Sequence, residues 1–346
     1  MFHMAILVDD VGSFPLPEKM SRESFDRAYN KARHVVAAGE GALGADPLYD
    51  PFSSVVIDSF KLKLSAGLDI VTYPQQYDMH KQVLDLVYRA ADKGTYLVDY
   101  DEAILPEVNV IKNEARNLSE YYGRPIRFRV CVAGPLELYL KVIGTTFYED
   151  VMMMFAETVK RFLKNSIINS KYIETTVVSI DEPSFGFHEV QADKDCVAAA
   201  LERACDLNGV TRQIHLHSPA HVSDLLDVRN IDVLSFEFAA SPNNIDAVSR
   251  NMLEKGDKKI RVGIARTDVD AMIAELHDKG AAQQNAEQLV EPEDVIRRRF
   301  EIAKAKYGDQ MTFTGPDCGL GGWPSPQSAL LLLRRTVEAV RKETAN

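Results

Sequence analysis

The pattern that most constrains the fold of this chain is a repeated alternation of a short β-rich run with a longer helical segment. Eight runs suited to strands recur along the sequence, at 5–9, 68–73, 126–133, 175–181, 211–217, 232–237, 259–264 and 310–314. Between most of them, apolar residues recur at i, i+3, i+4 and i+7, the spacing of an amphipathic helix. This alternation predicts an α/β fold, a (β/α)8 TIM barrel, with a doubly wound open sheet as the alternative.

The helical segments add detail to this prediction. They lie at 148–170, 193–207 and 244–255, and proline marks the start of two more, at Pro292 and Pro326, which run to about residues 307 and 342. The first two intervals between strands are long and hold further helical patterns at 21–38 and 52–66. We therefore expect a barrel with extra N-terminal helices. No linker divides the chain, so we expect a single domain over 1–346.

Composition narrows the class of protein. The formal net charge of −11 argues against binding to nucleic acid or to an anionic membrane. No apolar run approaches the roughly 18–20 residues that cross a bilayer, and no basic segment followed by an apolar one opens the chain. The four cysteines, Cys131, Cys196, Cys205 and Cys318, are too widely spaced for a disulfide framework. These features favour a cytoplasmic protein without nucleic-acid or membrane partners.

In a barrel, catalytic residues lie at the C-terminal ends of the strands. After the first predicted strand, Gly12 allows close approach of the main chain to a ligand and Ser13 adds a hydroxyl, although a simple turn explains both equally well. After the second, Gln75 and Gln76 suit a polar substrate or a loop surface. The fourth ends in two adjacent carboxylates. Because side chains alternate across a strand, we favour Asp181 as the one that faces the site, where it binds an amino group or accepts a proton.

Four residues at later strand ends carry metal-binding chemistry. His215 and His217 are two apart and share one face of a strand, a spacing that suits two imidazoles on one metal. Glu237 closes an apolar strand, where a carboxylate needs a cation or hydrogen bonds. Cys318 lies among glycines after the last strand. Nitrogen, oxygen and sulfur donors together suit Zn²⁺ better than Mg²⁺ or Ca²⁺; His221 is a further, less favoured donor.

In order and spacing, these blocks resemble the catalytic barrel of cobalamin-independent methionine synthase and the wider family of zinc-dependent thiol methyltransferases that share it. The resemblance runs through nearly the whole chain and is carried by residues 11–15, 134–135, 180–183, 213–217, 232–237 and 316–320, the last block being the most specific. It implies a zinc ion held by His, Cys, Glu and Cys. In that family the zinc binds the thiol of the substrate, homocysteine, as a thiolate, which attacks a methyl group on a donor to give methionine, and the resemblance implies the same reaction here.

The resemblance also implies roles for individual residues. Glu237 matches the glutamate ligand and Cys318 matches the second cysteine ligand of the family. Ser13, with the main chain of Gly12, matches the turn that binds homocysteine. Asp181 matches the aspartate that holds the amino group of the substrate.

The chain departs from the family at two places. The first ligand pair of the family is His-x-Cys. If His217 is the histidine, Pro219 stands where the cysteine belongs; if the pair is His215 and His217, the zinc ligands become two histidines, Glu237 and Cys318. The run Gln-Ile-His-x-His favours the first alignment, and the ligand count favours the second. Gln75 and Gln76 occupy a region where the family has an acidic residue, which implies a different thiol or another way of holding the amine of homocysteine.

The sequence leaves alternatives for the methyl donor and for the substrate. The full-length family enzyme resembles two barrels in tandem, the first of which helps to hold a folate, whereas short relatives take the methyl group from methylcobamide on a corrinoid protein. No cobalamin-binding segment is evident here, so a corrinoid would arrive on a partner or free. The first alternative is a transferase of the same fold that acts on coenzyme M or alkylates a thiol with an epoxide. The second is a non-catalytic barrel that binds a corrinoid or methionine as an accessory protein.

Overall fold

Eight parallel strands form one sheet, in a computed structural model that describes residues 5–39, 51–186, 194–278 and 286–344. The strands are β1 (Leu7–Val8), β2 (Val71–Thr72), β3 (Ile126–Ala133), β4 (Ile173–Asp181), β5 (Thr211–Leu216), β6 (Val233–Phe236), β7 (Lys259–Ala265) and β8 (Met311–Pro316). Each strand from β2 to β7 pairs with the next one in the chain, and β8 pairs with β1. A parallel bridge between Asp9 and Ile70 joins the two remaining edges. This ring order confirms the predicted barrel and excludes the doubly wound sheet, in which the strand order reverses.

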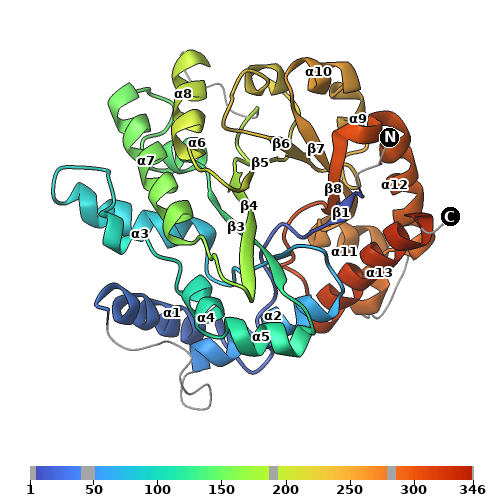
Figure 1. The fold of residues 1–346 in the computed structure, drawn as a ribbon, viewed down its shortest axis with the longest axis horizontal. Helices are drawn as coiled ribbons and strands as arrows, with labels where there is room; N and C mark the ends of the chain where they lie inside the picture. Colours follow the sequence, from blue (N-terminus) through green and yellow to red (C-terminus); the bar gives the residue numbers. More distant parts are fainter. Residues whose placement is uncertain (1–4, 40–50, 187–193, 279–285, 345–346) are drawn as a thin grey trace.

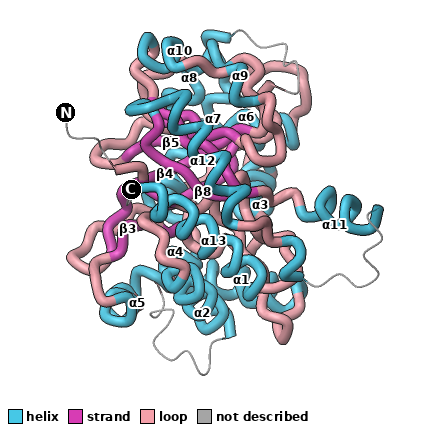
Figure 2. Tube along the Cα trace, turned by 90° about the vertical axis from the view of Figure 1, so that its right-hand side faces the viewer, coloured by secondary structure: helices cyan, strands magenta, loops and turns pink. Residues whose placement is uncertain are grey.

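Helices surround the strands (Figures 1 and 2). They are α1 (Arg22–Ala37), α2 (Pro51–Ser65), α3 (Met79–Ala91), α4 (Pro106–Asn113), α5 (Ala115–Tyr122), α6 (Pro135–Val142), α7 (Glu149–Asn165), α8 (Lys194–Ala204), α9 (Asn244–Ala247), α10 (Arg250–Lys255), α11 (Val269–Asp278), α12 (Glu293–Tyr307) and α13 (Pro326–Thr344). The predicted extra N-terminal helices are present as α1 and α2, between β1 and β2. Within the described segments, no helix is long and apolar enough to cross a membrane.

Two predicted helices differ from the structure. The segment 244–255 forms two helices, α9 and α10, because Ser249 caps α10 by accepting a hydrogen bond from the Met252 N–H (3.2 Å). The segment 148–170 is helical only over α7, since the chain then turns into an antiparallel bridge between Asn169 and Glu174 beside β4. The first residue of the predicted helix 193–207 lies outside the described residues.

The barrel interior changes from apolar to charged along the strands. An apolar layer lies toward their N-terminal ends, formed by Leu7, Ile70, Val177, Val233 and Phe313. Beyond it, Asp9 is shared by two arginines, at 2.6 Å from Arg261 Nε and 3.2 Å from Arg129 Nη1, and all three side chains are fully buried. Apolar residues of similar volume often stabilise a fold as well as a buried ion pair does. We therefore expect this charged layer to do more than fill the barrel.

Candidate metal centre

Four predicted donors converge at the C-terminal ends of the strands. One ligand atom from each of His215, His217, Glu237 and Cys318 lies within 4.8 Å of the other three. His215 belongs to β5 and His217 follows it, while Glu237 and Cys318 follow β6 and β8. The structure keeps His221 out of this group; its side chain is 57% exposed and lies beside Asp224.

Two separations among His217, Glu237 and Cys318 fit a tetrahedral zinc ion. Cys318 Sγ lies 3.6 Å from His217 Nε2, and His217 Nε2 lies 3.5 Å from Glu237 Oε1. Zinc bonds of about 2.3 Å to sulfur and about 2.0–2.2 Å to nitrogen and oxygen, at tetrahedral angles, separate S from N by about 3.6 Å and N from O by about 3.4 Å. These two separations therefore match those that such an ion requires.

One ring nitrogen of His215 is buried without a hydrogen-bond partner. Its side chain is buried, and its Nδ1 lies 3.1 Å from the Ser235 hydroxyl. Its Nε2 is also buried but has no hydrogen-bond partner. A buried polar atom left without a partner costs about 1–3 kcal/mol, and a metal ion that accepts the Nε2 lone pair removes that cost.

Burial sets the protonation of the four donors. It lowers the pKa of both histidines, that of His215 well below its usual value, so both imidazoles are neutral at pH 7. Burial also raises the pKa of Glu237 to about 7, and burial together with the Glu237 carboxylate raises the pKa of Cys318 to about 12. The histidines are thus ready to act as ligands, whereas Cys318 must exchange its proton for the metal.

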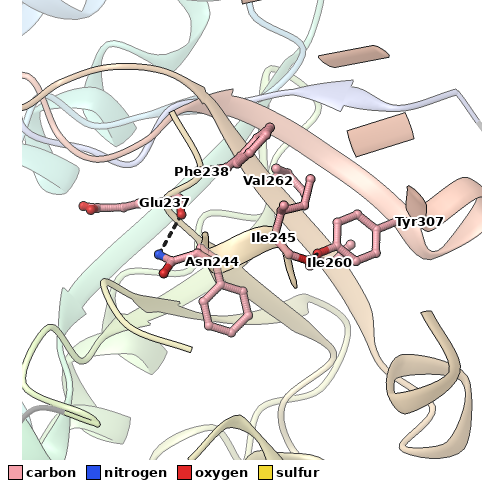
Figure 3. Close-up of a pocket in the computed structure, with 8 residues that line it drawn as sticks. Glu237, Phe238, Asn244, Ile245, Ile260, Val262 and Tyr307 are labelled. Carbon is pink, nitrogen blue, oxygen red and sulfur yellow. Dashed lines mark hydrogen bonds between the residues drawn. The ribbon is translucent and has the colours of Figure 1, made fainter. Parts of the chain in front are cut away.

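A side chain that the sequence reasoning missed connects two of the ligand-bearing loops. Asn244 Nδ2 donates to the main-chain carbonyls of His217 (3.2 Å) and Glu237 (2.9 Å). Figure 3 shows the second of these bonds, and shows the Glu237 side chain pointing away from the small apolar pocket lined by Ile260, Val262 and other residues. The Asn244 amide therefore fixes the spacing of two donors through their main chain.

Asp317 connects the Cys318 loop to the Glu237 loop. Its buried carboxylate accepts hydrogen bonds from three consecutive main-chain N–H groups after Glu237, at 2.6–3.1 Å. The Cys318 N–H donates to Thr267 Oγ1 (3.1 Å). The position of Asp317, directly before Cys318, was the only signal of this role in the sequence.

The adjacent carboxylates Asp181 and Glu182 point in different directions, as strand alternation predicts. Asp181 is buried inside the barrel, where it accepts a hydrogen bond from Ser179 Oγ (3.1 Å), and burial raises its pKa to about 6. Glu182 instead accepts from the Leu136 and Glu137 N–H groups at the start of α6, at 2.9 and 2.7 Å. Asp181 is the one that remains available to a ligand.

The first strand's loop lies against the Cys318 loop. Ser13 Oγ accepts a hydrogen bond from the Gly321 N–H (3.1 Å). A Cβ atom added at Gly319 would stand 2.1 Å from Ser13 Oγ. Ser13 is therefore at the mouth of the barrel, next to one of the proposed metal ligands.

The side chains of the two glutamines after β2 have different surroundings. The Gln75 side chain packs against the main chain of Gly12: a Cβ atom added at Gly12 would be 2.5 Å from Gln75 Oε1. Gln75 also has a left-handed φ of 44°, which is strained for a non-glycine residue, and its buried Nε2 has no partner. Gln76 points elsewhere, since its Nε2 donates to Pro15 O (3.1 Å) and Ser59 Oγ (3.0 Å).

Comparison with known proteins bears on the fold. No family model matches the chain, and no curated protein matches its sequence. A B12-independent methionine synthase from Shewanella sp. W3-18-1, solved with selenomethionine, aligns over 99% of both chains with a TM-score of 0.55 and 16% identity. A Listeria monocytogenes protein assigned as a vitamin-B12-independent methionine synthase aligns over 98% of both chains, with a TM-score of 0.54 and 14% identity. The resemblance drawn from the sequence is thus confirmed for the fold, which this chain shares with both structures over almost its whole length.

Proposed function

We propose that this protein is a zinc-dependent methyltransferase that moves a methyl group to a thiol, with homocysteine as the leading substrate and methionine as its product. One observation carries the proposal. Nitrogen, oxygen and sulfur donors from separate strand ends lie within 4.8 Å of one another, and one of them is a buried nitrogen without a partner. The two methionine synthase structures of the same fold agree with it.

The ligand set that we propose is His215, His217, Glu237 and Cys318. Pro219 has no donor atom, so it cannot take the place of a cysteine ligand. His215 supports the alternative, because a ring nitrogen of His215 lies within 4.8 Å of the other three donors and its Nε2 has no hydrogen-bond partner. Zinc held there lowers the pKa of a substrate thiol, which makes a thiolate available at neutral pH.

The protein's own residues orient the rest of the substrate in this proposal. Asp181 is paired in register with His215 across β4 and β5, so its carboxylate lies beside the proposed metal site. With a pKa of about 6 it is mostly ionised at pH 7 and suits a substrate ammonium group. Gly12 and Ser13 line the adjacent loop, where main-chain and hydroxyl groups suit the carboxylate end of an amino acid.

For the methyl donor we propose methylcobamide on a separate corrinoid protein, in line with the short relatives that the sequence resembles. A methyl-folate is the alternative. The test is to measure zinc in the purified protein, and then methyl transfer to homocysteine from methylcobalamin and from methyl-folate in parallel.

A cysteine variant tests the ligand assignment. Cys318→Ala should lose both stoichiometric zinc and methyl transfer, while Cys196→Ala in α8 should keep both. Full zinc content in Cys318→Ala would refute the ligand assignment. A native protein without any metal affinity would instead favour the accessory role, as a corrinoid- or methionine-binding barrel.

A thiol with an anionic end group, such as coenzyme M, is the second candidate substrate. It is favoured by Gln75, whose buried Nε2 is a hydrogen-bond donor without a partner beside Gly12. Such a donor suits a sulfonate oxygen, and neither Gln75 nor Gln76 supplies the carboxylate that the ammonium group of homocysteine would need there. Competition between homocysteine and coenzyme M for a limited amount of methyl donor distinguishes the two candidates.

A further inference from the structure

His215 Nδ1, the ring nitrogen opposite the unpartnered Nε2, has a hydrogen-bond partner. His215 Nδ1 lies 3.1 Å from Ser235 Oγ, and both residues are buried and paired in register across β5 and β6. A histidine that binds metal through Nε2 carries its proton on Nδ1, and the group that accepts this proton's hydrogen bond fixes the orientation of the ring. Ser235 Oγ is placed to be that acceptor.

Arg261 donates a hydrogen bond to the Ser235 hydroxyl. Each nitrogen of its buried guanidinium has one partner: Nε donates to Asp9 Oδ1 (2.6 Å), Nη1 to Ser235 Oγ (3.5 Å) and Nη2 to Pro316 O (2.9 Å). Pro316 is two residues before Cys318. The guanidinium therefore connects the strand of one proposed ligand to the hydroxyl that holds another.

Gly315 leaves the space that the Arg261 guanidinium occupies. A Cβ atom at Gly315 would lie 2.7 Å from Arg261 Nη2 and 2.0 Å from the Asp9 carbonyl oxygen. Because a planar guanidinium presents its donors in a fixed geometry, Arg261 holds β1, β6 and β8 at set distances beneath the metal cluster. The buried charged layer of the barrel therefore fixes the distances between these strands.

We infer that Ser235, braced by Arg261 and Asp9, is a positioning residue that holds His215 as a metal ligand through Nε2. The inference rests on the proposed zinc site and goes beyond it, because it explains how a histidine occupies the position that Pro219 cannot. Ser235 is not one of the four clustered donors, so in this proposal it acts through the His215 imidazole.

A double-mutant cycle on zinc affinity tests the inference. Zinc dissociation constants are measured by chelator competition for wild type, Ser235→Ala, His215→Ala and the double variant. Loss of such a supporting hydrogen bond weakens metal binding by roughly 10–100-fold, so Ser235→Ala should show a loss of that size. If Ser235 acts through His215, removing it in the His215→Ala background should change the affinity less than twofold.

Two measurements separate positioning from a general structural effect. Cobalt-substituted Ser235→Ala should show shifted d–d absorption bands, whereas Ser179→Ala, a buried serine of β4 that bonds Asp181, should keep both the wild-type bands and the zinc affinity. The metal-free Ser235→Ala protein should keep the far-UV circular dichroism of wild type, although its melting temperature should fall because His215 Nδ1 and Arg261 Nη1 lose their shared partner. Equal zinc affinity in wild type and Ser235→Ala, or additive losses in the cycle, would overturn the inference. Absence of zinc binding in wild type would instead refute the proposed metal site on which it rests.

Discussion

Zinc binding by this protein should depend strongly on pH, because two of the proposed ligands hold protons that the metal must displace. In the metal-free protein the histidines are already neutral, and their lowered pKa values keep them so above pH 6.5. Glu237 has a pKa raised to about 7 and Cys318 a pKa raised to about 12, both chiefly by burial. Metal binding stabilises the ionised forms, so a rise in pH favours binding.

The number of protons released follows from these values. Cys318 contributes about one proton throughout the range from pH 6 to pH 9, and Glu237 contributes about 0.9 at pH 6, 0.5 at pH 7 and 0.1 at pH 8. Zinc affinity should therefore rise close to tenfold per pH unit above pH 8, and close to a hundredfold per unit near pH 6. Each proton corresponds to about 1.4 kcal/mol per pH unit.

Competition with a chromophoric chelator, corrected for the chelator's own titration, gives the affinity at each pH. Calorimetry in buffers of different ionisation enthalpy counts the protons directly. Glu237→Gln is the matched variant, because it removes one titrating ligand and should leave a slope near tenfold per unit at every pH. An affinity that stays constant from pH 6 to pH 9 would refute the reasoning, since it would mean that neither Cys318 nor Glu237 gives up a proton to the metal.

Two further substitutions test the substrate side and the loops that support it. Gly134→Ala should lower the free energy of unfolding in urea by about 2–6 kcal/mol, because its Cβ would stand 2.1 Å from Glu182 Oε1, an overpacking that costs about 1–3 kcal/mol, and would displace a carboxyl that accepts hydrogen bonds from two main-chain N–H groups, each worth about 0.5–1.5 kcal/mol. Gly123→Ala, in a left-handed position with no atom within 4 Å, should cost only about 1–2 kcal/mol, and equal losses would show that Glu182 anchors nothing. Asp181→Asn should raise the KM for homocysteine at least about tenfold through loss of a charge-assisted hydrogen bond, while zinc content and the KM for a thiol without an amino group stay unchanged. An unchanged KM for homocysteine would remove Asp181 from amine binding.

Much of the fold was predictable because its signals are local. The alternation of strand and helix patterns identified eight strands, and the bounds of β3 agree with the prediction at both ends. β1 and β2 are shorter than predicted, with two residues each in the ladder, because the ring closes between them through a single bridge. Closure depends on the whole barrel, so no local pattern reports it.

The charged interior could not be predicted. Asp9 meets Arg129 and Arg261 across 120 and 252 residues of chain, respectively. In the sequence, these arginines look like exposed positions on ordinary strands. Only ring closure places the two guanidinium groups around one carboxylate.

The candidate metal site shows the same division between what was predictable from the sequence and what was not. By itself, the sequence determined that nitrogen, oxygen and sulfur donors end separate strands, and the two-residue spacing put His215 and His217 on one face, because side-chain direction along a strand has a period of two. It left open whether His215 or a residue at the position of Pro219 completes the set. The tertiary structure brought His215 within reach of the other three donors, and the register of β5 against β6 sets Ser235 beside His215 Nδ1, which leaves Nε2 without a hydrogen-bond partner. The physical reason is that composition and spacing are properties of short segments, whereas the meeting of four atoms within a few ångströms is a property of the closed barrel.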